Sequence, residues 1–329
     1  MTTAEILAAI PKLAALVVGD ICLDYWCTYD PSLSEPSRET GIPRIGVMGS
    51  YGSPGAGGTV ANNLIALNAY RVAAVGVIGD DGHGFELTRA LRERGVVLDL
   101  MVRDPRLPTF TYTKFVNSET GVEDRPRIDF VPFRPLPEQV ERQIMTRLES
   151  AIRGFDVVLV ADQAETEYGG VITPEVRRLL RKLALKNPGR VIWADSRRRV
   201  EQFRGLIVKP NRNEADEVCL RLFGAIDYQR LRLHLETKLL VVTRGEEGAV
   251  VVTPGKETPV PTVRIEKPVD ICGAGDSFSA GAALALAAQA SPIEAARFGN
   301  LVASVTIMKP GTGTASPEEV LAAEAAVSP

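Results

Sequence analysis

The chain has 329 residues, of which 45% are hydrophobic and 24% are charged, and its formal net charge is −3. This is the composition of a globular protein with a large buried core. Lys and Arg are spread along the chain instead of forming one basic face, so we expect no nucleic-acid partner. The apolar run at 280–288 is too short to cross a bilayer, so we expect no membrane partner.

The cysteines, the histidines and the N-terminus limit the chemistry and the location of the protein. The four cysteines form no CxxC pair and there are only two histidines, which leaves too few ligands for a zinc site. A disulfide framework is not expected in a chain of this size. Residues 1–20 have no basic segment before their apolar part, so they predict a short helix and a buried strand rather than a signal peptide. We therefore expect a cytoplasmic protein.

The first part of the chain predicts strands and helices that are interrupted by two insertions. In chain order, the sequence predicts a strand at 16–18 that ends in Gly19-Asp20, a helix at 59–69, a strand at 72–78 and a helix at 85–94 closed by Gly95. Residues 29–52 are polar, and only 44–48 look like a strand. Residues 109–116 and 127–131 alternate with period two on either side of a turn, which predicts a β-hairpin outside the central sheet.

The second part of the chain is more regular. It predicts helices at 138–153, 174–186, 276–288 and 293–308, a helix that starts near 214, and strands at 156–160, 191–194, 206–208, 239–243 and 249–252. Strands that alternate with helices favour an α/β fold with a mostly parallel central sheet covered by helices on both faces. We expect one domain over residues 1–329, with lid insertions at about 29–52 and 106–132.

Polar residues follow the predicted strands at several places. Parallel sheets bind ligands at the carboxyl ends of their strands, although a single polar residue there is most often a helix cap. The residues at these ends are Asp20, Asp24, Asp162, Asp195, Asn211, Glu214, Thr243 and Gly245. Their number favours a shared site over independent caps.

Two further segments each have two interpretations. The glycine-rich segment 52–58 is either a dinucleotide-binding loop, with Asp80 as the ribose-binding acid, or a bare helix start that lets a polar ligand approach. The spacing fits the first interpretation poorly, and in the second Asn62 adds hydrogen bonds from one turn inside the helix. The only basic cluster, residues 197–199, is either a solvated loop or a phosphate contact.

The segment Gly273-Ala274-Gly275-Asp276 stands at the start of an apolar helix. Small residues let successive N–H groups converge on one point, and the helix dipole adds positive potential there, so the segment predicts an anion hole. Asp276 either caps the helix or takes a proton from a hydroxyl while the N–H groups hold a phosphoryl group. We expect the positive helix end to keep Asp276 ionised. This arrangement suits phosphoryl transfer to an alcohol.

At this point the sequence resembles the ribokinase-like (PfkB) carbohydrate kinases over almost the whole chain. Residues 270–278 are similar to the C-terminal signature of that family. Gly57-Gly58 with Asn62 resembles its GGxxAN motif, residues 211–214 its NxxE motif, and Thr243-Arg-Gly245 with Gly248 its TxGxxG motif. The segment from 109 to 131 resembles the β lid over the sugar.

The resemblance implies a ribokinase-like fold with a small β lid, ATP and Mg²⁺ as cofactors, and a homodimer formed through the lid. It implies Asp276 as base and Gly273, Ala274 and Gly275 as the anion hole, with Asp20, Asp24, Gly57, Gly58, Asn62 and Asp162 on the sugar side. On the nucleotide side it implies Asn211, Thr243, Gly245, Gly248 and Asn300, with Glu214 organising Mg²⁺ through water. A K⁺ site is implied at Asp270 and Cys272, where Cys272 replaces the usual threonine.

Within the family, residues 19–25, Thr113-Lys114 and residues 311–317 look most like the heptose-phosphate kinases, with Lys114 as a contact for the substrate phosphate. Fructokinases, ribokinases and nucleoside kinases are the alternatives among enzymes. A sugar- or nucleotide-sensing protein is the alternative outside catalysis. Asp276 and Glu214 argue against a sensor, because a protein that only binds needs no base.

Overall fold

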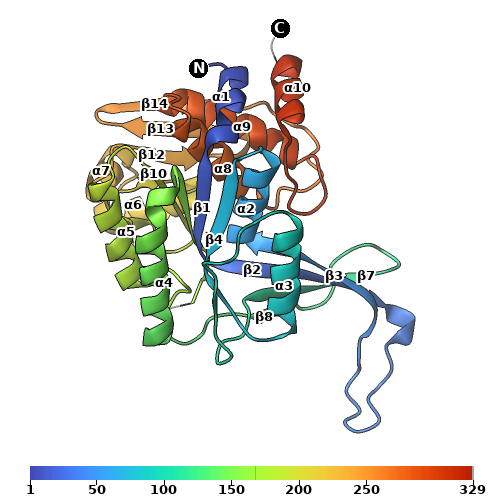
Figure 1. The fold of residues 1–329 in the computed structure, drawn as a ribbon. Coiled ribbons are helices and arrows are strands. Elements are labelled where there is room, and N and C mark those ends of the chain that lie inside the picture. The colour runs from blue at the N-terminus through green and yellow to red at the C-terminus, as the bar shows by residue number, and fades with distance from the viewer. Residues whose placement is uncertain (167, 328–329) are drawn as a thin grey trace.

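The computed structural model describes residues 1–166 and 168–327. Its centre is an eight-stranded sheet in the order β14-β13-β12-β11-β10-β9-β1-β4 (Figure 1). The strands are β1 (Ala14–Gly19), β4 (Arg71–Val75), β9 (Val157–Asp162), β10 (Val191–Ser196), β11 (Ile207–Val208), β12 (Leu240–Thr243), β13 (Ala249–Thr253) and β14 (Lys256–Val260). Neighbours from β4 to β12 are parallel, whereas β13 and β14 add to the sheet antiparallel.

Helices cover both faces of this sheet because successive residues of the strands point to opposite sides. In β1, Ala15 and Val17 belong to one core, whereas Leu16 and Val18 belong to the other. The first core packs against α1 (Thr3–Ala9), α2 (Gly57–Ala66), α3 (Gly82–Glu93), α8 (Ala274–Ala287), α9 (Pro292–Thr306) and α10 (Pro317–Val327). The second packs against α4 (Glu138–Ala151), α5 (Pro174–Lys186), α6 (Arg212–Phe223) and α7 (Tyr228–His234).

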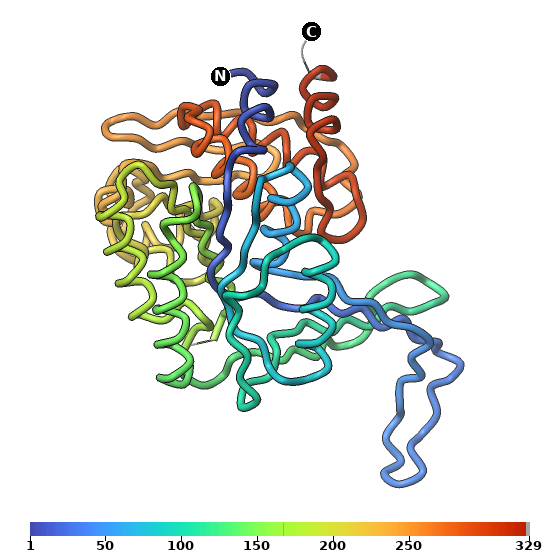
Figure 2. Tube along the Cα trace, in the orientation of Figure 1, coloured from blue at the N-terminus to red at the C-terminus, as the bar shows by residue number. Residues whose placement is uncertain are grey.

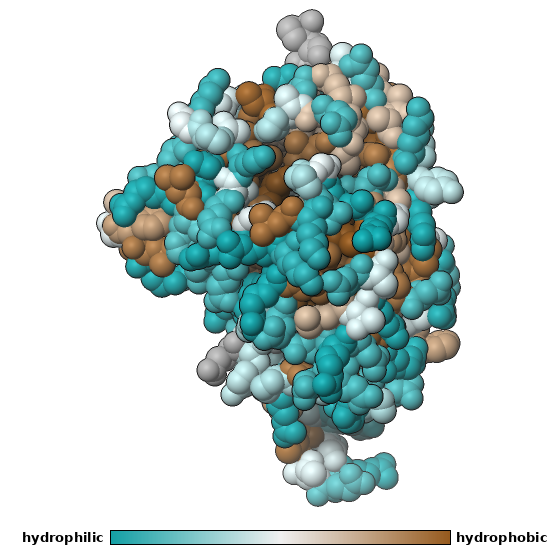
Figure 3. Space-filling model, turned by 60° about the vertical axis from the view of Figure 1, so that its left-hand side comes forward, coloured by the Kyte–Doolittle hydropathy of each residue, from teal (hydrophilic) through white to brown (hydrophobic). Residues whose placement is uncertain are grey.

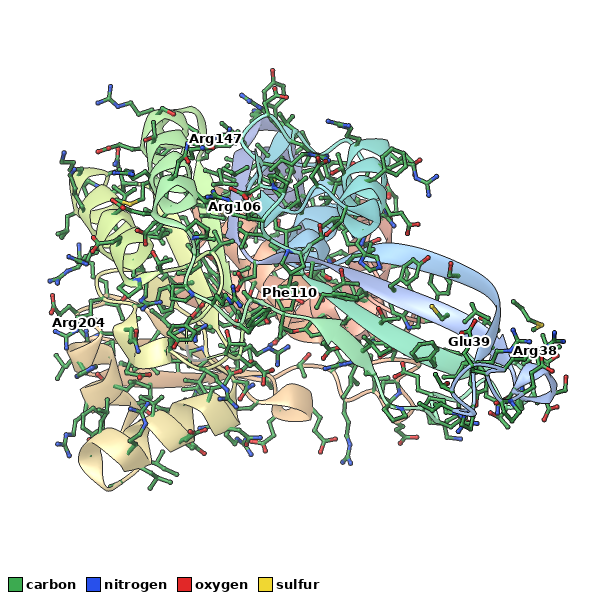
Figure 4. All side chains as sticks on the ribbon, turned by 90° about the horizontal axis from the view of Figure 1, so that it is seen from below. Arg38, Glu39, Arg106, Phe110, Arg147 and Arg204 are labelled. Carbon is green, nitrogen blue, oxygen red and sulfur yellow. The ribbon has the colours of Figure 1, made fainter. Side chains whose placement is uncertain are left out.

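A second, four-stranded sheet projects from one edge of this body (Figures 1 and 4). We call it the lid sheet, and its strands are β3 (Gly46–Ala56), β2 (Ile21–Asp30), β7 (Thr111–Asn117) and β8 (Ile128–Phe130), in that order. Figure 4 shows Phe110 where the lid sheet meets the body and Arg38 and Glu39 at the far tip of an arm. A short parallel pair, β5 (Val77–Ile78) and β6 (Val102–Arg103), lies apart from both sheets.

The parallel sheet with helices on both faces confirms the predicted fold class, and α5 has the predicted bounds. The insertion expected at 29–52 needs correction, because β2 starts at Ile21 and β3 runs on to Ala56. The predicted strand at 72–78 breaks at Gly76, where a Cβ atom would lie 2.8 Å from the Gly19 carbonyl oxygen. The sequence missed β14, α7 and α10, and it started α2, α3 and α8 two or three residues late.

The two chain ends lie on the same side of the body, as the Cα trace in Figure 2 shows. On the face drawn in Figure 3, hydrophilic residues cover most of the surface, and apolar residues form separate small areas. In the part of the chain that the structure describes, no helix is both long and apolar enough to pass through a membrane.

Candidate active site

The N-terminus of α8 begins at the segment for which the sequence predicted an anion hole. Gly273 has a φ of 78°, a left-handed conformation that glycine adopts without strain, and it turns the chain into the helix. The N–H of Ala274 donates to the carbonyl of Ile271 at 3.2 Å. The N–H groups of Gly273, Gly275 and Asp276 donate to no acceptor within the described residues. These three N–H groups are therefore available to a ligand, whereas the N–H of Ala274 is already used. The contribution of Ala274 is its small side chain.

Asp276 lies on the first turn of α8 and is partly exposed. Burial of the carboxyl and the neighbouring Asp195 raise its pKa from 3.8 to about 7, against the opposing effects of Lys209 and Arg197. The expectation that the helix dipole keeps this group strongly acidic is wrong, because desolvation and like charge outweigh the dipole. A pKa near neutrality improves Asp276 as a general base.

Three more charged groups surround Asp276, and with it they form what we call the reaction cluster: Asp195, Lys209, Glu214 and Asp276. Asp195, near the end of β10, forms an ion pair with Lys209, and Asp195 Oδ2 lies 2.6 Å from Lys209 Nζ. Burial and Asp195 raise the pKa of Glu214, while Lys209 opposes the rise. The cluster thus joins the ends of β10 and β11 to the start of α8.

Glu214 and Asn211 form a capping box at the start of α6. Asn211 Oδ1 accepts the N–H of Glu214 at 2.9 Å, and Glu214 Oε2 accepts the N–H of Asn211 at 2.7 Å. Glu214 Oε1 stays available on the side of the reaction cluster. No group of three or more His, Cys, Asp or Glu side chains among residues 1–166 and 168–327 could hold a metal directly. A Mg²⁺ bound through water by Glu214, with ATP supplying ligands, fits this arrangement.

On the sugar side, α2 starts beside the anion hole. A Cβ atom on Gly273 would lie 3.1 Å from Thr59 Cγ2 of α2, so the two helix N-termini meet. Asn62 is buried, and its Oδ1 has no hydrogen-bond partner in the described part of the chain. Gly57 and Gly58 are needed for packing, since Cβ atoms there would lie 3.0 Å from the Asp20 carbonyl oxygen and 2.6 Å from Pro54 Cβ.

Asp24 lies on β2, on the lid sheet. Its carboxylate accepts no hydrogen bond from any described residue, and burial raises its pKa, whereas Lys114 and Arg127 lower it. Gly55 of β3 is paired with Cys22, two residues before Asp24, and a Cβ atom on Gly55 would lie 2.5 Å from Asp24 Oδ2. Asp24 is therefore an unsaturated carboxylate with bare backbone beside it, as a sugar-binding residue requires.

Asp20 and Asp162, which the sequence assigned to the sugar, hold loops instead. Asp20 Oδ2 accepts the N–H groups of Gln163 and Ala164, both at 2.9 Å, and Oδ1 accepts that of Val171 at 2.8 Å. A Cβ atom on Gly170 would lie 1.9 Å from Asp20 Oδ1. Only glycine therefore fits where this loop comes closest to the Asp20 carboxylate. Burial, then Asp162, raises the pKa of Asp20 to about 6.

Asp162 is fully buried and pairs with Arg199 through both oxygens. The distances are 2.8 Å from Nη2 to Oδ1 and 3.1 Å from Nε to Oδ2, and Ser196 Oγ donates to Oδ2 at 2.6 Å. We call Asp20, Asp162, Ser196 and Arg199 the holding cluster. Each of the two carboxylates accepts three hydrogen bonds from protein groups.

The basic cluster 197–199 fits neither predicted interpretation as a whole. Arg199 is buried in the holding cluster, whereas Arg198 is exposed and lies 4.0 Å from Glu165. Arg197 Nε donates to Gln163 Oε1 at 2.8 Å. Burial of the guanidinium opposes its charge, but Asp195 and Asp276 raise the pKa of Arg197 overall.

The face of the lid sheet that carries Asp24 also carries aromatic and cationic side chains. Asp24 is opposite Tyr112 and Trp26 is opposite Lys114 in the register of β2 and β7. Lys114 Nζ lies 4.9 Å from the centre of the Trp26 ring, and Arg127 lies 4.6 Å from that of Tyr112. The sequence analysis singled out Lys114 but not Trp26, Tyr112 or Arg127, because their contacts follow only from the pairing of β2, β7 and β8.

Among the residues that the sequence assigned to the nucleotide, two glycines and Asn300 determine the backbone conformation. Thr243 ends β12, and Gly245 and Gly248 adopt positive φ values of 56° and 85°. A Cβ atom on Gly248 would lie 2.3 Å from the Val260 carbonyl oxygen, which also accepts Asn300 Nδ2 at 3.1 Å. Asn300 therefore fixes the backbone after β14 instead of presenting a free amide.

The predicted K⁺ residues tie two loops together. Asp270 Oδ1 accepts the N–H of Cys272 at 2.8 Å, and Oδ2 accepts that of Gly311 at 3.1 Å. Cys272 is exposed, whereas Cys22, Cys27 and Cys219 are buried. Any cation here would share Asp270 with these two N–H groups.

The dinucleotide-loop interpretation of residues 52–58 does not fit the structure. The strand before α2 is β3, an antiparallel strand of the lid sheet, and not the first strand of the parallel sheet. A dinucleotide loop joins a parallel strand to the following helix. The second interpretation, a bare helix start, agrees with the observed geometry.

Comparison with known proteins places the chain in a family. Residues 15–319 match the pfkB family of carbohydrate kinases. The bifunctional protein HldE of Trichlorobacter lovleyi is 33% identical over 322 residues, and that of Pelobacter propionicus is 32% identical over 324 residues. The matches cover 94% of this chain but only 62% and 63% of those proteins. The chain belongs to the pfkB family and is an ATP-dependent carbohydrate kinase.

Solved structures show the same fold. Phosphofructokinase-2 of Escherichia coli superposes with a TM-score of 0.73 at 20% identity, covering 95% of this chain and 99% of that one. A ribokinase of Arabidopsis thaliana, complexed with ribose and ATP, superposes with a TM-score of 0.68 at 21% identity, covering 94% and 98%. These likenesses confirm the ribokinase-like architecture.

Proposed function

We propose that the protein phosphorylates a sugar that already carries a phosphate group, with heptose 7-phosphate as the substrate. The observation that carries this proposal is a pair of cations on the substrate-facing side of the lid sheet. Tyr112 pairs with Asp129 and Thr113 with Ile128 between β7 and β8, so the next position brings Lys114 opposite Arg127. Both cations lower the pKa of Asp24, which places them on its side of the sheet.

Like charges directly opposite each other destabilise a sheet unless a counter-ion lies between them. Arg127 has Asp129 as a partner, through bonds of 3.0 and 2.8 Å. Lys114 forms no ion pair with a carboxylate of the described chain and rests only on Trp26. A phosphate on the substrate would neutralise the charge of Lys114 and Arg127.

The motif resemblance to heptose-phosphate kinases supports the same substrate, as does the identity to the HldE proteins over nearly the whole chain. A fructokinase, ribokinase or nucleoside kinase acts on a neutral substrate, which leaves Lys114 without an anionic partner. A protein that only senses a ligand needs no general base, so it would not need the raised pKa of Asp276.

The residues perform the transfer in one in-line step. Asp24 and Asn62 orient the sugar, and Asp276 accepts the proton as the hydroxyl oxygen bonds to the γ-phosphorus of ATP. The bond from that phosphorus to the ADP oxygen breaks, and ADP leaves with the electron pair. The N–H groups of Gly273, Gly275 and Asp276 hold the phosphoryl oxygens. Glu214 would hold Mg²⁺ through water, and the ion would supply positive charge to the phosphates of ATP.

Turnover against a panel of neutral sugars, sugar phosphates and nucleosides tests the substrate. We expect turnover with heptose 7-phosphate and at least about tenfold lower kcat/KM with the unphosphorylated heptose. Lys114→Ala and Arg127→Ala should each raise KM for the sugar phosphate about 10- to 100-fold and leave KM for neutral sugars unchanged. Lys182→Ala, which removes a lysine paired with Glu149 on the exposed surface, is the matched control.

Equal KM changes for phosphorylated and neutral sugars would contradict the phosphate assignment while leaving the kinase activity in place. Rates with and without K⁺ complete the panel. Stimulation by K⁺ would support a cation site at Asp270 and Cys272. Equal turnover rates with and without K⁺ would contradict such a site.

The same proposal includes a cytoplasmic homodimer formed through the lid sheet. Large apolar side chains are exposed on the arm and the start of β3, namely Leu33, Ile42, Ile45, Val47 and Met48. Exposed apolar patches of this kind mark association surfaces. Light scattering during gel filtration tests the dimer, and Val47→Glu with Met48→Glu should give a monomer.

A further inference from the structure

Lys209 lies under the anion hole, although no sequence motif pointed to it. It follows β11 directly, is only 4% exposed, and its backbone N–H donates to the Ala194 carbonyl at 2.9 Å. A Cβ atom on Gly275 would lie 3.2 Å from Lys209 Nζ. The ammonium therefore lies against the backbone of Gly275, whose N–H is one of the free donors of the anion hole.

The ammonium has more donors than the protein uses. Lys209 Nζ forms one ion pair, with Asp195 Oδ2 at 2.6 Å. An ammonium has three N–H donors, and no other acceptor for them occurs in the described part of the chain. A buried ammonium with unused donors costs stability unless a ligand completes it.

Lys209 also stays charged. Burial by itself lowers its pKa, but Asp195, then Glu214 and Asp276, raise it above the usual value overall. Three carboxylates around one ammonium keep it protonated at any pH at which the protein works. It cannot serve as the base, so its contribution is positive charge.

We propose that Lys209 is a further catalytic residue, whose ammonium donates to the transferring phosphoryl group beside the N–H groups of Gly273, Gly275 and Asp276. This inference rests on the kinase activity but not on which sugar is the acceptor. Lys209 keeps its proton throughout, while Asp276 takes the proton of the sugar and ADP leaves with the electron pair of the broken bond. Asp195 is a positioning residue, because it acts by holding Lys209.

Nucleotide binding tests this contact without any sugar. In the presence of Mg²⁺, Lys209→Met should weaken binding of a non-hydrolysable ATP analogue about tenfold or more, while the Kd of ADP changes by less than about twofold. Only the analogue carries a γ-phosphoryl group, so a loss of structure alone would affect both nucleotides. Lys182→Met, which removes the exposed lysine paired with Glu149, should change neither Kd.

Turnover gives the second readout. With any sugar that the wild-type protein phosphorylates, Lys209→Met should lower kcat about 10²- to 10³-fold, as removal of one donor to a developing charge does. Lys209→Arg should restore part of the loss, and Asp195→Asn should lower kcat less than Lys209→Met. Equal weakening of both nucleotides, or a kcat within about threefold of wild type, would overturn the proposal. If Lys209→Met does not fold, the Kd values of the ATP analogue and of ADP are compared in Lys209→Arg and Asp195→Asn instead. If Lys209 has only a structural role, neither variant should bind the ATP analogue selectively more weakly than ADP.

Discussion

The holding cluster and the reaction cluster lie at the same edge of the central sheet, and each contains a buried aspartate at a strand end, Asp162 in β9 and Asp195 in β10. In the holding cluster, three backbone N–H groups saturate Asp20, and a bidentate Arg199 with Ser196 saturates Asp162. In the reaction cluster, Asp276 accepts no hydrogen bond from the described residues, and its pKa rises to about 7.

The difference shows that burial alone does not separate structural from catalytic carboxylates. What separates them is whether protein groups already satisfy the carboxylate oxygens. A saturated carboxylate stabilises the loops that it binds, whereas an unsaturated one costs stability and remains available to a ligand. Substitutions in the two clusters should therefore have opposite effects on activity and on stability.

The largest expected effect is on turnover in the reaction cluster. Asp276→Asn should lower kcat by about 10³-fold or more, because general-base catalysis contributes about 10²- to 10⁴-fold and the amide cannot accept the proton. Steady-state kinetics by coupled ADP release measures this, with ADP affinity as the control for an intact site. A variant that keeps more than a tenth of kcat would exclude Asp276 as the base.

The same substitution should stabilise the fold. The carboxyl has a pKa of about 7 in the folded protein against 3.8 unfolded, so the folded state favours its protonated form. That contribution is present below pH 3.8 and is lost as the pH rises through about 7. Above that pH, Asp276→Asn removes an unfavourable buried charge, and we expect the free energy of unfolding in urea to rise by on the order of 1 kcal/mol.

The next largest effect is on stability in the holding cluster. Asp162→Asn leaves Arg199 buried without its carboxylate, which should lower the free energy of unfolding by about 3–5 kcal/mol. Molecules that remain folded at low temperature should keep kcat within about threefold of wild type, because the buried Asp162 carboxylate bonds to Arg199 and Ser196. Urea denaturation and kinetics on the same sample measure both quantities. A loss of kcat without a loss of stability would move Asp162 to the reaction cluster.

A smaller effect is expected at Gly170. An alanine Cβ there would lie 1.9 Å from Asp20 Oδ1, so the loop must shift away from its anchor. Gly170→Ala should lower the free energy of unfolding by about 1–3 kcal/mol. Gly189→Ala is the matched control, because a Cβ atom at Gly189 meets nothing within 4 Å. Equal stability of the two variants would contradict the tight approach of this loop to Asp20.

The smallest effect is a labelling rate. Cys272 is exposed beside the anion hole, whereas the other three cysteines are buried. Although the residue is exposed, desolvation of its thiol raises the pKa of Cys272, so alkylation should be slow at pH 7 and faster as the pH rises. We expect iodoacetamide to label one thiol and abolish turnover, with ATP and sugar together slowing the reaction. Cys272→Ser should keep activity and resist the reagent, and inactivation of that variant would point to another thiol.

The sequence could predict the central sheet because its strands are continuous apolar runs that alternate with amphipathic helices. It could not predict β2 and β3, because β2 mixes apolar residues with Asp24, Thr28 and Asp30 without a regular period, and β3 is mostly exposed and rich in glycine. For the same reason it missed Trp26 and Arg127, which gain their meaning only from the pairing of β2, β7 and β8.

In the site, the sequence could place Asp276 and the anion hole, since a short motif at a helix start determines their geometry. It could not separate Asp20 and Asp162 from Asp24, because the loop amides and the arginine that saturate the first two come from residues 163–171 and from Arg199. Lys209 could be recognised only from its contact with Gly275, which lies 66 positions further along the chain. A lysine at the end of a buried strand, before Pro210-Asn211, was the available signal.

The pH dependence of kcat/KM for ATP tests the central claim, that Asp276 is an unsaturated base whose pKa its buried neighbours raise. We predict that kcat/KM rises with pH up to about 7 and is constant above it, because the protonated carboxyl cannot accept the proton. Asp195→Asn should move this limb to lower pH, since Asp195 is the strongest charged neighbour that raises the pKa, whereas Glu149→Gln on the exposed surface should not move it. A limb below about pH 5 in the wild-type protein, or one that Asp195→Asn leaves in place, would contradict the account.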